Sequence, residues 1–281
     1  MPEIIAQRML APRVALLRVA APEVAAKAEP GQFVVVRLDE RAERIPLTIA
    51  EADRSAGALT LVVQEAGYST AALARLAAGD IIQDLLGPLG KPTEIEKVGT
   101  VVCIGGGIGA APVLPQARAH RRIGNRVLGI IGAQTRAALI LEDEMRAACE
   151  RLIVTTDDGS YGRHGLVTDA LRDLLAEGLQ VDQVTAIGPV PMMHAVAELT
   201  RPLKIKTVVS LNPIMIDGTG MCGGCRVSVG GETKFACVDG PEFDGHRVDF
   251  GELRRRQGMY REEERRAVEA AAGEDCRCSL G

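Results

Sequence analysis

Residues 100–112 read TVVCIGGGIGAAP, and this stretch decides the fold of the central part of the chain. An apolar strand runs directly into Gly105, Gly106, Gly107, Ile108 and Gly109, and Pro112 lies at the start of a helix. Small residues let the backbone approach a pyrophosphate, while the helix start supplies NH groups and a positive dipole. Glycine runs also mark ordinary turns. This glycine run, however, follows a strand directly and precedes a helix, and that context predicts a dinucleotide-binding loop.

The alternation of strands and helices continues from residue 98 to residue 211. Apolar runs typical of parallel strands are RVLGIIGAQ (126–134), RLIVTTDD (151–158), QVTAIGPV (183–190) and IKTVVSLN (205–212). Helical stretches lie between them at residues 111–122, 137–149, 167–177 and 191–200. Strands alternating with helices predict a doubly wound α/β domain with a parallel sheet over residues 98–211.

Two loops at the ends of these strands are further candidates for the binding site. Asp157 and Asp158 end the strand of residues 151–156, where short polar side chains can bond ribose hydroxyls. For Asp158 a solvated turn is an equal alternative. Gly188, Pro189 and Met192 follow the next strand, and Met193 is expected in the core of the next helix.

Residues 1–97 have the pattern of a small antiparallel β-barrel. Short strands are expected at residues 14–19, 32–38, 58–64 and 80–84, with Pro-Gly and Ala-Gly turns between them. The stretch LLGPLGKP (85–92) is expected to be a loop that ends this block. Several strands at this spacing predict a barrel in front of the parallel sheet.

Composition limits the possible partners and compartment. The 281 residues carry 33 basic and 37 acidic side chains, a net charge of −4, which argues against nucleic acid or an anionic membrane as the main partner. No apolar run is long enough to span a bilayer, and the N-terminus lacks the order of a signal peptide. We therefore expect a cytoplasmic protein without membrane attachment. In that compartment the seven cysteines point to metal or redox chemistry, although Cys103 and Cys149 are expected to be inert packing residues.

A third segment, residues 212–250, contains the sequence DGTGMCGGCRVSVGGETKFAC (217–237). Cys222 and Cys225 form a C-x₂-C pair, and Cys237 follows after eleven residues. Plant-type [2Fe–2S] ferredoxins use C-x₄-C-x₂-C with a distant fourth cysteine, and here Asp217 occupies the first of these positions. Three thiolates and one carboxylate could hold a [2Fe–2S] cluster. A structural zinc site is the alternative, although Cys237 has no paired ligand nearby and His246 stands alone.

Several motifs resemble the ferredoxin reductase superfamily. The glycine loop is similar to the G-x-G-x-G/A-x-x-P of its nicotinamide domains. The segment from Gly188 to Met192 resembles the C/G-G-P-x-x-M that lies beside the nicotinamide, with glycine in place of the usual cysteine. RIPLT (44–48) resembles the R-x-Y/P-x-S/T motif of the flavin-binding barrels. The resemblance implies an FAD site with Arg44, Pro46, Leu47, Thr48, Val62, Val63, Gln64, Gly67, Ser69 and Thr70, in which Ser69 and Thr70 also cap a helix over residues 71–77. Taken alone, RIPLT is a weak signal, because a surface arginine before a proline-bounded strand is more common.

The order of barrel, nicotinamide domain and cysteine module resembles two related electron-transfer subunits. One belongs to dihydroorotate dehydrogenase. The other is the small subunit of NADH-dependent reduced ferredoxin:NADP⁺ oxidoreductase, also known as a sulfide dehydrogenase subunit. The dihydroorotate type carries cysteine at the position of Asp217, whereas the ferredoxin:NADP⁺ type has aspartate, and the resemblance therefore favours the second.

This resemblance implies that electrons move between NAD(H), FAD and a [2Fe–2S] cluster in a flavin-based electron-bifurcating complex. It further implies a larger partner subunit that binds FAD, [4Fe–4S] clusters and NADP(H), and through which ferredoxin is reached. The alternatives are a subunit of NAD-dependent dihydroorotate dehydrogenase and a zinc-stapled protein without redox function. No catalytic acid or base can be identified. Arg136 could meet the 2′-phosphate of NADP, whereas Asp157 and Asp158 disfavour one, and the resemblance favours NAD(H). The charged residues 251–281 are expected to form a solvated helix and tail, from which Cys276 or Cys278 could supply a fourth ligand.

Overall fold

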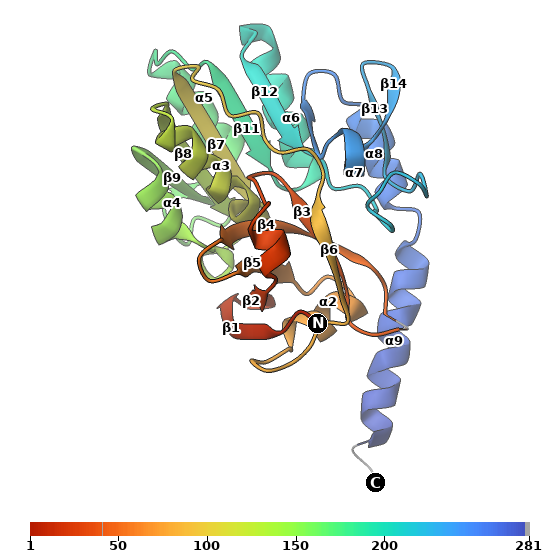
Figure 1. The fold of residues 1–281 in the computed structure, drawn as a ribbon. Coiled ribbons are helices and arrows are strands. Elements are labelled where there is room, and N and C mark those ends of the chain that lie inside the picture. The colour runs from red at the N-terminus through yellow and green to blue at the C-terminus, as the bar shows by residue number, and fades with distance from the viewer. Residues whose placement is uncertain (41, 279–281) are drawn as a thin grey trace.

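The chain folds into two sheets that lie side by side, with a small module attached to the larger sheet (Figure 1). The computed structural model describes the backbone of residues 1–40 and 42–278, and side chains as far as Glu269. The fold has the three predicted parts, an antiparallel barrel, a parallel sheet with helices and a C-terminal cysteine module.

The N-terminal sheet is antiparallel and has the order β1-β2-β5-β4-β3-β6. Its strands are β1 (Ile4–Ala11), β2 (Val14–Ala20), β3 (Phe33–Arg37), β4 (Ile45–Asp53), β5 (Ala58–Gln64) and β6 (Asp84–Leu89), with the short helices α1 (Pro22–Ala25) and α2 (Tyr68–Ala74). The free side of β1 pairs with the segment just before β6, through the backbone hydrogen bond from Ile4 to Asp80 and the bridge between Glu3 and Ile81. This pairing closes the sheet into a barrel, and inward residues such as Leu17, Leu59 and Leu61 fill it.

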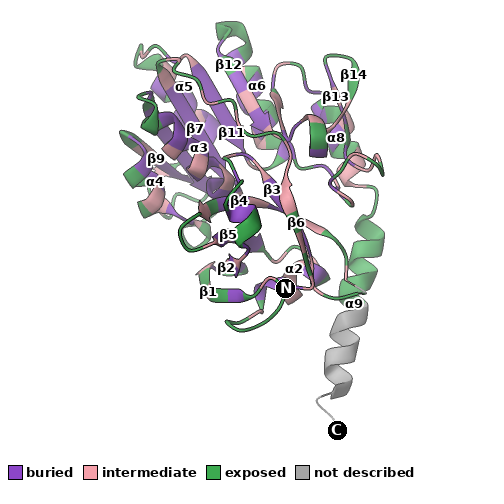
Figure 2. Ribbon diagram, in the orientation of Figure 1, coloured by how far each residue is buried: buried purple, intermediate pink, exposed green. Residues whose placement is uncertain are grey.

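The second sheet is parallel except at its edge and has the order β10-β9-β8-β7-β11-β12-β15. Its strands are β7 (Thr100–Gly106), β8 (Arg126–Ala133), β9 (Arg151–Thr156), β10 (Arg163–His164), β11 (Gln183–Ile187), β12 (Lys206–Ser210) and β15 (Glu242–Asp244). Alternate strand residues face opposite ways. Val101 and Cys103 pack with helices α3 (Ala110–Arg122) and α4 (Glu142–Ala148), while Val102 and Ile104 pack with α5 (Val167–Ala176) and α6 (Val190–Thr200). The buried strands lie between these helix layers in Figure 2.

The cysteine module consists of the hairpin β13 (Arg226–Val229) and β14 (Glu232–Phe235), helix α7 (Ala236–Asp239), strand β15 and helix α8 (Phe250–Gln257). β15 pairs antiparallel with β12, so the module supplies the last strand of the parallel sheet. Cys225, Val227 and Phe250 belong to the same apolar core as Val102 and Ile104 of β7. The module is therefore continuous with the parallel-sheet domain rather than tethered to it.

The C-terminal helix α9 (Arg261–Cys278) projects from the module past α2 of the barrel (Figure 1). Its described side chains are solvent-exposed and carry ion pairs such as Arg265–Glu269. The side chains of Cys276 and Cys278 lie outside the described part of the chain. No helix in that part is long and apolar enough to cross a membrane.

Five local expectations were wrong. The strand expected over residues 80–84 is reduced to a bridge at Ile81. The expected loop that follows it instead contains most of strand β6 (Asp84–Leu89), because backbone pairing with β3 overrides the Gly-Pro turn signal. Helix α2 begins at Tyr68, and Gly67 is its N-cap, because the Gly67 NH donates a hydrogen bond to the Thr70 hydroxyl. Ser69 and Thr70 therefore lie inside the first turn of the helix and do not precede it. The helix expected over 137–149 is confined to α4, because Leu141 adopts φ 56° just before it. The charged tail forms two helices, α8 and α9, instead of one.

Candidate cofactor cleft and cluster-binding loop

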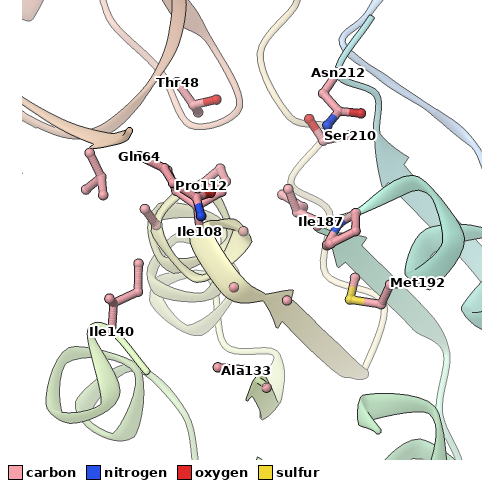
Figure 3. Close-up of a pocket in the computed structure, with 18 of the residues that line it drawn as sticks. Thr48, Gln64, Ile108, Pro112, Ala133, Ile140, Ile187, Met192, Ser210 and Asn212 are labelled. Atoms are coloured by element: carbon pink, nitrogen blue, oxygen red, sulfur yellow. The ribbon is translucent and has the colours of Figure 1, made fainter. Parts of the chain in front are cut away.

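A cleft of about 970 Å³ lies between the barrel and the carboxyl ends of the parallel strands (Figure 3). The barrel contributes Thr48 and Gln64, and the glycine loop contributes Ile108 and Pro112 from below. Residues 210–213 and Met215, which lead from β12 into the cysteine module, line the third side. Clefts at the carboxyl ends of parallel strands are where open α/β sheets bind nucleotides.

On the barrel side, some of the predicted flavin residues line the cleft and others do not. Pro46, Leu47, Thr48, Val62 and Gln64 line the cleft, with hydroxyl, amide and apolar groups facing it together. Val63 points into the barrel core and Arg44 is exposed. The helix cap residues lie outside the cleft lining: the Ser69 hydroxyl donates to Glu43 Oε2 at 2.8 Å, and the Thr70 hydroxyl accepts from the Gly67 NH at 2.9 Å.

The glycine loop is packed so tightly that three of its positions have no room for a Cβ atom. A Cβ on Gly105 would lie 2.7 Å from Ala110 Cα, one on Gly106 2.3 Å from Met192 Sδ, and one on Gly109 2.0 Å from the Ile187 carbonyl oxygen. Gly107 is the exception, with φ +55° and open space where its Cβ would be. The loop thus draws α3 against β11 while leaving an open backbone face toward the cleft, as a pyrophosphate cradle requires.

The segment from Gly188 to Met192 closes this end of the cleft. Gly188, Pro189 and Met192 all line it. Met192 packs over both Gly106 and Gly188, so its thioether holds the two loops together. Met193, as expected, is fully buried in the core.

At the far end of the cleft, Asp157 lines the wall, whereas Asp158 stabilises its own turn. Asp158 Oδ1 accepts the Ser160 NH at 2.9 Å, and hydrogen bonds from Ser160 hold the pKa of this carboxyl below its usual value. The Arg136 guanidinium stacks on the Tyr161 ring, 5.0 Å from its centroid. For Asp158 this geometry favours the turn alternative.

The cysteine module holds its four candidate ligands in two pairs. Cys225 and Cys237 are buried, and their Sγ atoms lie 3.2 Å apart. Burial and the neighbouring Cys225 thiol raise the pKa of Cys237 to about 12. Cys222 is exposed, and its backbone NH donates to Asp217 Oδ2 at 2.7 Å. Backbone NH groups, that of Thr219 first, hold the pKa of Asp217 below its usual value.

The donor types suit an iron–sulfur cluster. A metal bound here would displace the thiol protons of the cysteines into solvent, and the lowered pKa of Asp217 keeps its carboxyl ionised at neutral pH. Within the described residues, no three His, Cys, Asp or Glu side chains lie close enough together to surround one metal ion. Gly218, Gly220 and Gly223 have φ of +75°, +86° and +66°, which lets the loop between the pairs fold tightly.

Two neighbours connect this loop to the rest of the molecule. A Cβ on Gly218 would lie 2.7 Å from Leu89 of β6, so the loop packs directly on the barrel beside the cleft. Arg256 of α8 donates from Nη2 to the Gly224 carbonyl at 3.2 Å, and its buried Nε has no partner among the described atoms. A cation therefore lies against the loop between Cys222 and Cys225.

Sequence reasoning missed several cleft residues. Ser210, Leu211 and Asn212 follow the last parallel strand, and that position could have marked them as cleft residues. Phe33, Met215 and Pro241 reach the cleft from separate parts of the chain, and no local signal marks them. The expected inert packing of Cys103 and Cys149 is confirmed, since burial raises the pKa of both thiols, that of Cys149 to about 11.

Comparison with known proteins supports this division of the chain. Residues 212–249 match the family described as the iron–sulfur cluster binding domain of dihydroorotate dehydrogenase B. A homologue of the dihydroorotate dehydrogenase B (NAD⁺) electron transfer subunit from Thermotoga maritima is 48% identical, over 88% of this chain and 87% of its own. The electron transfer subunit of Bacillus caldolyticus is 38% identical, over 84% of this chain and 93% of its own.

A solved structure is similar over almost the whole chain. It belongs to NADH-dependent reduced ferredoxin-NADP oxidoreductase, described in connection with flavin-based electron bifurcation. The matching chain has 43% identity and a TM-score of 0.93, covering 97% of this chain and 98% of that one. The barrel, parallel sheet and cysteine module thus occur together in an experimentally determined structure.

Proposed function

Because this chain belongs to the family of dihydroorotate dehydrogenase B electron-transfer subunits, we propose that it moves electrons between NAD(H), FAD and a [2Fe–2S] cluster. We further propose that it does so as the small subunit of a flavin-based electron-bifurcating NADH-dependent reduced ferredoxin:NADP⁺ oxidoreductase. The observation that carries the proposal is the single cleft shared by the barrel, the glycine loop and the segment leading into the cysteine module.

Each wall of the cleft has a distinct task in this proposal. Thr48 and Gln64 hydrogen-bond and orient an isoalloxazine ring, while Pro46, Leu47 and Val62 exclude water from one side. The open NH groups at Gly107 and the start of α3 receive a dinucleotide pyrophosphate, and Asp157 meets a ribose hydroxyl. When bound, a flavin supplies the chemistry that accepts a two-electron hydride and passes electrons on singly.

The cysteine module supplies the one-electron end. Asp217, Cys222, Cys225 and Cys237 are the proposed ligands, and a [2Fe–2S] cluster held there supplies one-electron transfer. Met215 lines the cleft only two residues before Asp217, and Gly218 packs on the barrel, so the ligand loop begins at the cleft wall. This adjacency supports the proposal that a hydride-accepting site and a single-electron site lie next to each other.

The bifurcating assembly is favoured over dihydroorotate oxidation by the residue at position 217. Asp217 stands where dihydroorotate-type subunits are expected to have cysteine. Sequence identity does not separate the two, since it is 43% to the ferredoxin-NADP oxidoreductase chain and 48% to the Thermotoga maritima homologue. The proposed partner is a larger subunit with FAD, [4Fe–4S] clusters and an NADP(H) site, through which ferredoxin is reached.

Isolation of the tagged full chain with its partner tests the assembly. We expect flavin and [2Fe–2S] absorption in the chain itself, bleached by NADH, and co-purification with a large pyridine-nucleotide flavoprotein. A partner with a TIM-barrel FMN domain would support the dihydroorotate alternative instead. Colourless, zinc-containing protein would refute both redox functions.

Replacement of Asp217 tests the ligand set. Asp217→Cys should retain the cluster with a changed midpoint potential, whereas Asp217→Ala should lose it or alter its EPR signal, because an oxygen donor is exchanged or removed. Asp244→Ala is the matched control, since Asp244 likewise accepts the NH two residues on but belongs to β15. An unchanged EPR signal and potential in Asp217→Ala would show that Asp217 only stabilises its turn.

A further inference from the structure

A carboxylic acid lies where all three parts of the molecule meet. Glu242 is the first residue of β15 in the cysteine module, and its side chain reaches the linker between the barrel and the parallel sheet. We propose that Glu242 is a positioning residue that locks the barrel, the nicotinamide-type domain and the cluster module in the arrangement needed for electron transfer from flavin to cluster. This inference rests on the proposed function.

The contacts of Glu242 come from separate elements. Its Oε1 accepts hydrogen bonds from the Thr93 hydroxyl at 2.7 Å and from Gln116 Nε2 at 2.6 Å. Thr93 belongs to the linker and Gln116 to α3, where Gln116 is fully buried. A Cβ on Gly31, in the turn before β3, would lie 2.7 Å from the same oxygen, so the barrel also closes on this carboxyl. One oxygen atom thus contacts the barrel, the linker and α3.

The backbone reinforces the same junction. The Lys91 NH donates to the Gly240 carbonyl at 2.7 Å, and the Thr93 NH donates to the Pro30 carbonyl at 2.8 Å. The linker is therefore held between the barrel turn on one side and the strand leading to Glu242 on the other. Displacing the Glu242 side chain would loosen contacts among all three parts.

The surroundings of the carboxyl favour its neutral form. Among the described residues no Lys, Arg or His nitrogen makes an ion pair with it. The titratable groups nearby are the carboxyl of Glu94 on the linker and the buried thiol of Cys103 on β7. Lys206 pairs with Glu94 and Glu96 instead of Glu242. Burial and Glu94 raise the pKa of Glu242 to about 7, against the opposing hydrogen bonds of Thr93 and Gln116.

Residues next to the junction in the chain belong to each proposed cofactor site. Helix α3, which carries Gln116, begins at the glycine loop. Pro241, next to Glu242, lines the cleft, and its carbonyl accepts the NH of Leu211, another cleft residue. Cys237 lies in α7, the helix that immediately precedes β15 and Glu242 in the chain. A charge formed on Glu242 would be repelled by Glu94 and would have no cation among the described residues to offset its burial. Movement of the charged side chain toward solvent would release Thr93 and Gln116 and let the cluster loop shift relative to the cleft.

The holoprotein with all its cofactors tests this inference by stopped-flow reduction with NADH between pH 6 and pH 8. Flavin bleaching and the later reduction of the cluster are followed separately. In the wild type, cluster reduction should slow as pH rises through about 7, while flavin bleaching stays constant. Glu242→Gln, an uncharged isostere, should keep the fast rate at every pH. Glu242→Ala should be slower by about tenfold at every pH, because positioning is lost.

Glu94→Gln is the matched control. It makes the same Glu-to-Gln change at a neighbouring carboxylate on the linker, but Glu94 is exposed, and its ion pair is with Lys206. It should retain the pH dependence of the wild type with a midpoint at lower pH. The inference is overturned if Glu242→Gln keeps the wild-type pH profile, or if Glu242→Ala reduces its cluster at the wild-type rate.

Stability against pH gives a second readout that needs neither flavin nor cluster. Glu242 binds its proton more tightly when folded than at its ordinary pKa of 4.5. The contribution of protonated Glu242 to the free energy of unfolding is therefore complete below pH 4.5 and is lost as pH rises through about 7. The thermal midpoint of Glu242→Gln should lack this decline, and a decline equal to that of the wild type refutes the junction role. Missing cofactors together with the expected stability profile would instead refute the proposed function.

Discussion

The glycine loop of the nicotinamide-type domain and the cluster loop of the cysteine module are both rich in glycine, but for different reasons. Gly105, Gly106 and Gly109 have ordinary φ values and are required because neighbouring atoms leave no room for a Cβ. Gly218, Gly220 and Gly223 are required chiefly because the chain turns through positive φ. The first loop is held by its neighbours, whereas the second is shaped by its own backbone. Glycine-rich loops beside one cleft therefore differ in what a substitution disturbs.

Among the substitutions that test this difference between the two loops, Gly109→Ala should have the largest effect. The new Cβ would meet the Ile187 carbonyl at 2.0 Å, a backbone atom that cannot rotate away, so α3 must move off β11. We expect a loss of about 3 kcal/mol in the free energy of unfolding, and at least about tenfold weaker NADH binding. Urea unfolding and NADH titration measure the two effects.

Gly107→Ala is the control for that substitution, because its Cβ would meet no atom and only the φ of +55° is unfavourable. Its stability loss should be about 1 kcal/mol. Equal stability of the two variants would contradict the conclusion that close packing selects glycine at residue 109.

A smaller effect is expected within the cluster loop. Gly218→Ala combines a φ of +75° with a contact of 2.7 Å to Leu89, a side-chain atom that can partly yield. We expect a loss of about 2 kcal/mol. Gly223→Ala has φ +66° and no contact closer than 3.4 Å, so it should lose about 1 kcal/mol. Thermal unfolding of both variants measures the difference, and the reverse order would show that the barrel contact is not formed.

The smallest expected change concerns the charge beside the loop. Arg256→Gln removes the cation that contacts the Gly224 carbonyl, so the reduced cluster loses a stabilising charge. Its midpoint potential should become more negative by on the order of 50 mV. EPR-monitored redox titration measures this, with the exposed neighbour Arg255→Gln as control. Equal potentials in the two variants would mean that Arg256 has only a packing role.

Much of the fold could be predicted because its signals are local. The apolar strands around β7 and the helices between them repeat with clear periodicity, and the glycine loop follows its strand directly. Strand β6 was missed because Gly87 and Pro88 are typical of loops, while pairing with the distant β3 decides their structure. Local patterns report propensity, and long-range pairing overrides it.

The candidate site was predictable only in part for the same reason. Thr48, Gln64 and the glycine loop belong to motifs, and the structure places them in one cleft. The role of Glu242 depends on Thr93 and Gln116, far from it in sequence, so nothing near residue 242 indicates it. The close approach of Cys225 to Cys237 is likewise a tertiary distance that their spacing does not fix.

The antiparallel strand β15 has a consequence for how such chains can evolve. It covers the edge of β12, and without it that edge would present unpaired NH and carbonyl groups to other molecules. A gene that lost the cysteine module would thus encode a sheet prone to self-association, not simply a reductase lacking one redox centre. Exchange of this module between proteins requires that the donor supply a closing strand, which ties the inheritance of the redox centre to the solubility of the host domain.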